Sequence, residues 1–182
     1  MKLSVTKIIV WLLVLGGVGW LIRILMAPIP GRAIADQGRE HVSQEVIDKT
    51  VYNSNPPVSG PHLETWVKPG IYLELQRKGE LIHSLEHGYV EIHYTCSPTS
   101  ILEATDSATL QKAACKTLAS TLEQLAKKEK LWKLLVVYNP TITHSIVLAA
   151  WGQLEELDSF DEKKIVTFID YWRDHGPEQT ME

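Results

Sequence analysis

The sequence of 182 residues lacks most of the patterns that identify a function directly. Lysine and arginine number 18 against 22 acidic residues, and no basic stripe is present, so nothing indicates a protein that binds nucleic acid. The two cysteines form no Cys-x-x-Cys pair, which leaves a thioredoxin-like redox role without its motif. A Gly-x-Ser-x-Gly nucleophile elbow and internal repeats are also absent. The function must therefore be inferred from other residues, above all from the histidines.

The one long hydrophobic run lies near the N-terminus, at residues 8–26, and a single arginine interrupts it. At about 1.5 Å of rise per residue, a helix over this run nearly spans the hydrocarbon core of a bilayer. Lys2 and Lys7 precede the run and favour a cytoplasmic N-terminus. We therefore expect residues 1–28 to be a single-pass membrane anchor that carries the domain out of the cytoplasm, to the periplasm or the cell exterior. A cleaved signal peptide, with its site at Ala33-Ile34-Ala35, is the alternative.

The rest of the chain predicts one α+β domain, a small mixed β-sheet packed by helices, over residues 51–177. Residues 29–50 are typical of a linker, and residues 178–182 form a tail. Apolar periodicity predicts the element order β-α-β-α-β-β-α. The expected strands are 71–75, 89–94, 131–138 and 145–151, and the first two expected helices are 82–87 and 106–127. Ser159 and Glu162 fit a capping box at the start of the last helix.

A stretch in the middle of the chain concentrates three histidines and two glutamates. In a short helix, His83 and His87 are four residues apart and lie on one face. Gly88 suits the end of such a helix. In the strand that follows, alternation puts Glu91 and His93 on the face opposite the apolar row. We therefore expect His93 at the surface or beside the ligands of a site.

Two histidines at positions i and i+4 can hold one metal ion, so His83 and His87 predict a metal site. A third imidazole would come from His62, at the end of a proline-rich segment, or from His41. The prolines exclude a helix there and hold the segment extended at little entropic cost. Three nitrogen donors with one open position are typical of zinc and copper sites. In the alternative, structural interpretation, the histidines only brace the loop against the helix, and backbone groups bond their ring nitrogens.

Glu86 directly precedes His87 and is expected on a different face of the short helix. There it would orient a ligand or form a packing ion pair rather than bind the metal itself. The string His83-Ser-Leu-Glu-His87 also matches the H-x-x-E-H zinc pattern of inverzincin peptidases, which makes a metal-dependent hydrolase with Glu86 as base an alternative. That alternative requires Glu86 in an open cleft, and a buried Glu86 would remove it.

Cys96 follows the strand at 89–94, and Cys115 lies in the first half of the next expected helix. An oxidising compartment would favour a disulfide between them, closing a loop of about twenty residues and adding about 3 kcal/mol. Two free, half-buried thiols are the alternative.

Three segments carry a resemblance to a known family: Tyr52-Asn-Ser-Asn-Pro-Pro-Val-Ser-Gly-Pro-His62, Leu81-Ile-His-Ser-Leu-Glu-His-Gly-Tyr-Val90 and Ala150-Trp-Gly152. Together they resemble DUF3105, a membrane-anchored bacterial and archaeal domain of unknown function, over about residues 38–177. The resemblance implies a shared site at the recurrent histidines, which map to His62, His83 and His87, with His41 at a further position. It implies no reaction, and support of an assembly of envelope proteins is one role that we expect. The cysteine pair is not part of the family pattern.

Overall fold

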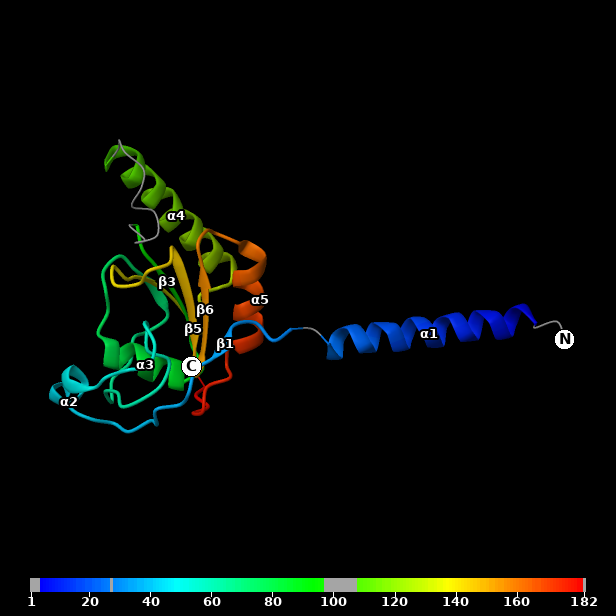
Figure 1. Cartoon of the computed structure of the whole chain (residues 1–182), viewed down its shortest axis with the longest axis horizontal. Coiled ribbons are helices and arrows are strands. Elements are labelled where there is room, and N and C mark those ends of the chain that lie inside the picture. Colours follow the sequence, from blue (N-terminus) through cyan, green and yellow to red (C-terminus); the bar gives the residue numbers. More distant parts are fainter. Residues whose placement is uncertain (1–3, 27, 97–107, 182) are drawn as a thin grey trace.

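The computed structural model of the protein describes residues 4–26, 28–96 and 108–181. Helix α1, Val5–Leu25, extends away from the remaining elements, which gather around one sheet (Figure 1). Large apolar side chains of α1 are exposed, among them Trp11 and Trp20. Within the described residues, no helix combines the length and the apolar character needed to cross a membrane. The transmembrane span expected for residues 1–28 is therefore not supported.

Six strands form one mixed sheet in the order β1-β6-β5-β3-β4-β2. The central strand β3 is parallel to β4 and antiparallel to β5. β2 continues the parallel side beyond β4, and β6 and β1 continue the antiparallel side beyond β5. The strands are β1 (Arg32–Ala33), β2 (Gly70–Tyr72), β3 (Val90–Tyr94), β4 (Leu134–Tyr138), β5 (Ile146–Ala150) and β6 (Gln153–Leu157). The α+β class with a mixed sheet is confirmed.

Helices α4 (Ala108–Lys128) and α5 (Glu162–Trp172) cover one face of the sheet (Figure 1). Their apolar side chains and alternate strand residues form the largest core cluster, which includes Ile92, Val136, Leu148, Leu122 and Phe168. Burial of such side chains stabilises the fold by about 1.5–3 kcal/mol each.

The N-cap of α5 is Asp161, whose carboxylate accepts a hydrogen bond from the backbone N–H of Lys164. The capping box predicted at Ser159 and Glu162 is therefore wrong. A capping carboxylate bonds the N–H two or three positions into the helix, and Asp161 is the residue at that spacing.

Helix α3 (Lys78–Glu86) and the proline-rich segment cover the opposite face of the sheet. Leu81 and Leu85 of α3 pack in two smaller core clusters with side chains of β4 and β5. Because Glu91 pairs with Leu135 and His93 with Val137 in the parallel ladder, both polar side chains belong to this covered face. The predicted alternation in β3 is therefore right, although the polar face is buried rather than exposed.

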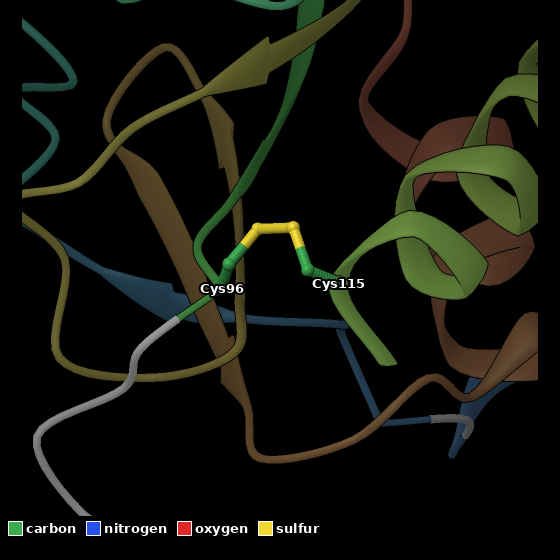
Figure 2. The surroundings of a disulfide bond; sticks show 2 residues. All are labelled: Cys96 and Cys115. Atoms are coloured by element: carbon green, nitrogen blue, oxygen red, sulfur yellow. A yellow bond between two sulfur atoms is a disulfide. The ribbon is translucent and has the colours of Figure 1, made fainter. Parts of the chain in front are cut away.

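Cys96, just after β3, and Cys115, on α4, form a disulfide whose Cα atoms are 4.9 Å apart (Figure 2). The predicted pairing is confirmed, and the chain has no free cysteine. The bond ties the α4 layer to the end of the central strand.

Residues 29–50, expected as a linker, contribute β1 at the edge of the sheet and the short helix α2 (Gln44–Lys49). β6 was not predicted from the sequence. Only two of its five residues, Leu154 and Leu157, are buried, and their spacing does not alternate as strand patterns require. The residue proposed to begin α4, Asp106, lies outside the described residues.

Candidate metal centre

Two extended segments lie side by side next to α3 and carry two of the predicted histidines. His41 and His62 form a parallel β-bridge. The backbone N–H of His62 donates to the carbonyl of Glu40 at 2.9 Å, and the N–H of Val42 donates to the carbonyl of His62 at 2.8 Å. The bridge places the two imidazole rings 4.9 Å apart between their centroids.

The proline-rich segment is fastened to α3 by close backbone contacts. An added Cβ at Gly79 would lie 2.8 Å from Cγ of Leu63, so a glycine is needed for this approach. Ser84 Oγ accepts from the N–H of Val67 at 3.0 Å and donates to the carbonyl of Val67 at 2.9 Å. These contacts hold the segment along the helix and bring His62 beside the helix residues His83 and Glu86.

The result is a cluster, here called the first group, of His41, His62, His83 and Glu86. One ligand atom from each lies within 4.8 Å of the other three, so the cluster could hold a metal ion. His62 Nε2 is 2.8 Å from Glu86 Oε2, and His41 Nε2 is 3.8 Å from the same oxygen. Ligand atoms about 2.1 Å from a tetrahedral zinc are roughly 3.4 Å apart, so small side-chain movements would complete the coordination.

The protonation of two imidazoles follows from their backbone partners. His62 Nδ1 lies 2.8 Å from the carbonyl of Gly60, and His83 Nδ1 lies 2.7 Å from the carbonyl of Leu63. Since a carbonyl only accepts, each Nδ1 carries a proton and donates it, so the lone pair of the neutral ring is on Nε2. That Nε2 atom lies 2.8 Å from Glu86 Oε2 in His62 and 3.0 Å from His87 Nε2 in His83. Backbone acceptors on the far nitrogen are typical of metal-binding histidines. The contact between His62 Nε2 and Glu86 Oε2 then requires either one shared proton or a cation.

The electrostatics of the cluster keep His83 neutral at physiological pH. The pKa of His83 is lowered from 6.5 to about 4, mainly by burial and also by the neighbouring imidazoles of His87, His62 and His41, and the hydrogen bond to Leu63 opposes the shift. A neutral imidazole is the form that binds a metal. His83 is therefore ready to act as a ligand without first losing a proton.

His87, predicted as a ligand together with His62 and His83, is separated from the first group. It belongs instead to a second group with His83 and Glu178, whose ligand atoms also lie within 4.8 Å of one another. Its Nε2 is 3.0 Å from His83 Nε2. The backbone N–H of Glu178 donates to the carbonyl of Glu86 at 3.0 Å, which attaches the C-terminal segment to the end of α3. His83 is thus common to both groups.

Glu86 was expected to support the ligands from another face of the helix, but it lies within the first group. It is three residues after His83, a spacing that also puts two side chains on one helix face. The side chain is only 4% exposed. This burial counts against the alternative of a hydrolase with Glu86 as base, because a base must reach a water in an open cleft.

His93 forms a separate buried pair with Glu91 rather than lying at the surface. Its Nε2 lies 2.7 Å from Glu91 Oε2, and both side chains are fully buried. Burial raises the pKa of Glu91, and the hydrogen bond and charge of His93 oppose the shift. His93 and Asn139 form part of the wall of a cavity of about 620 Å³.

Glu178 is the one member of these groups that sequence reasoning missed. It was placed in a five-residue tail, and no nearby pattern marks it as a ligand. Its position depends on Gly176, where an added Cβ would clash with the carbonyl oxygen of Glu86. That contact joins residues ninety positions apart, which no local pattern can predict.

The sequence model of a protein family described as "Protein of unknown function (DUF3105)" matches residues 41–182. The match includes every residue of the first and second groups. No curated protein and no solved structure matches the chain.

Proposed function

We propose that this chain, which belongs to the DUF3105 family, binds one zinc or copper ion through the first group. The observation that carries the proposal is the convergence of three imidazoles and one carboxylate from three segments. Two of these imidazoles have Nδ1 bonded to a backbone carbonyl and therefore present a lone pair at Nε2. Imidazole donors suit zinc and copper better than magnesium or calcium.

Metal binding fits these residues better than hydrolysis. Catalytic zinc sites use three protein ligands and keep a position open for water, whereas the first group offers four protein donors. Glu86 is buried, and a buried carboxylate is costly unless a cation or hydrogen bonds compensate it. A divalent ion bound beside its Oε2 would supply that compensation.

Metal content of the full chain, purified without a polyhistidine tag, tests the proposal. We expect about one zinc or copper ion per chain, and the loss of most of it in His62→Asn and His83→Asn. Asparagine keeps an N–H that can bond the backbone carbonyl and removes only the Nε2 ligand. His144→Ala is the matched control, because His144 pairs with Asp158 away from both groups. Absence of binding after titration of the folded wild type would refute the proposal.

We also propose that the domain works outside the cytoplasm. The disulfide between Cys96 and Cys115 supports this location, because such bonds persist mainly in oxidising compartments. Alkylation of free thiols in intact cells before lysis provides the test. We expect both cysteines to be protected until a reductant is added, whereas alkylation of both without reductant would refute the location.

A further inference from the structure

The first and second groups share one side chain, His83, and only one of its nitrogens can bind a metal. Nδ1 of His83 is 2.7 Å from the carbonyl of Leu63 and carries the proton that it donates. Nε2 therefore holds the only available lone pair, and one lone pair binds one ion at a time. Two ions cannot occupy both groups while this hydrogen bond persists. The two groups are alternative positions for a single ion.

The two positions are close enough for an ion to pass directly between them. His87 Nε2 lies 3.0 Å from His83 Nε2, a separation that ligands of one ion can have. An ion held by His83 can therefore gain His87 before it loses His62. Since His83 stays bound throughout, the ion is never released into the protein interior.

Each position has one exposed ligand, which is His41 in the first group and Glu178 in the second. The His41 side chain is 42% exposed and lines a groove of about 440 Å³ together with Leu63 and Arg77. Glu178 is exposed on the C-terminal segment. The other imidazole ligands, His62, His83 and His87, are buried. An ion can thus reach the first group at His41 and leave the second group at Glu178.

We propose that the protein relays a metal ion, zinc or copper, from an entry at His41 to an exit at Glu178 through the shared ligand His83. The proposal rests on metal binding by the first group and adds a direction of transfer to it. The relay is ligand exchange coupled to the movement of one proton, and the ion keeps its charge. His87 Nε2 gives up the proton that it donates to His83 Nε2, and the pair of His62 Nε2 and Glu86 Oε2 takes up a proton as the ion leaves the first group. His41, His62 and Glu86 dissociate from the ion as His87 and Glu178 bind it.

The second position is tested by zinc titration of the full chain, with metal-free wild type as the reference. His62→Asn should weaken zinc binding by about ten- to a hundredfold and leave residual binding at the second group. Adding His87→Asn to that variant should abolish the residual binding. If the double variant binds as the single variant does, no second position exists. Two zinc ions per wild-type chain would also overturn the relay.

The exit is tested by the rate at which zinc-loaded protein gives up its ion to an excess of a chromophoric chelator. Glu178→Gln should slow this release by about tenfold, whereas the control Glu162→Gln, an exposed residue paired with Lys128, should not. Equal release rates in the two variants would refute the exit at Glu178. Loss of zinc from Glu178→Gln at equilibrium would show instead that all the donors form one site. Failure of the wild type to bind zinc or copper refutes metal binding itself and is seen before any variant is compared.

Discussion

The buried imidazole of His83 gives the metal-free protein a specific dependence of stability on pH. Its pKa is lowered from 6.5 to about 4 in the folded state, first by burial and then by the neighbouring imidazoles. The unfolded chain therefore binds more protons than the folded chain between these two pH values. The free energy of unfolding falls as the pH drops through this window, and the full contribution of neutral His83 is present above it.

The two pKa values set an upper limit on the effect. Relative to its value at high pH, the free energy of unfolding should be lower by about 0.8 kcal/mol at pH 6, about 2 kcal/mol at pH 5 and about 3 kcal/mol at pH 4. The side chain of His41 is exposed, so water can reach the edge of the cluster and screen the charges within it. We therefore expect about half of these losses in the free energy of unfolding.

Urea unfolding of wild type and His83→Asn, each with a chelator present, measures this contribution at pH 7, 6 and 5. Every other titrating group is common to both proteins, so the difference between them isolates His83. We expect the difference in the free energy of unfolding to change by about 1 kcal/mol from pH 7 to pH 5, with the wild type losing more. If the free energy of unfolding depends on pH in the same way in both proteins, His83 is not held neutral. The assignment of its Nε2 as a ready ligand would then fail.

Three further results are expected. Zinc binding at pH 7 should release about one proton, since the ion replaces the proton required between His62 and Glu86, and calorimetry in buffers of different ionisation enthalpy measures it. Reduction of the disulfide should lower the free energy of unfolding by about 3 kcal/mol without changing zinc affinity, and an unchanged urea midpoint under reductant would contradict this. Lys133→Met should destabilise the protein by about 1.5–3 kcal/mol, because the buried ammonium donates hydrogen bonds to the half-exposed carboxylate of Asp174 and to the carbonyl of Thr180. The same change should loosen the C-terminal segment, with faster amide hydrogen exchange after residue 174, and unchanged exchange there would argue against this anchoring role.

Local patterns predicted much of the fold because local physical chemistry determines it. Alternation identified β3, and Gly88, with its φ of 82°, ends α3 close to the expected residue. The prediction failed where contacts between distant segments determine whether a side chain is buried. The polar face of β3 was expected to carry exposed or supporting side chains, but α3 and the proline-rich segment cover it and bury Glu91 and His93. No pattern within a strand states which of its faces another layer will cover.

In the candidate site, too, local patterns predicted some features and tertiary packing decided the others. The sequence indicated the kind of donor and the segments that carry them, and the i, i+4 pair of His83 and His87 does lie with Nε2 atoms 3.0 Å apart. It could not indicate that His83 would belong to one group with His62 and Glu86 and to another group with His87 and Glu178. That division depends on two contacts between distant segments, the β-bridge of His41 with His62 and the packing of Gly176 on the end of α3.

The cost of assembling these side chains without a metal is itself an argument about their role. A fold selected only for stability has little reason to bury a carboxylate and three imidazoles together, since well-packed apolar residues are often equally or more stabilising. If backbone hydrogen bonds alone satisfied these histidines, both nitrogens of each ring would face backbone groups. Instead His62 and His83 each direct one nitrogen to the backbone and the other to another ionisable side chain. That arrangement is expected of ligands held ready for a cation, and a bracing role leaves it unexplained.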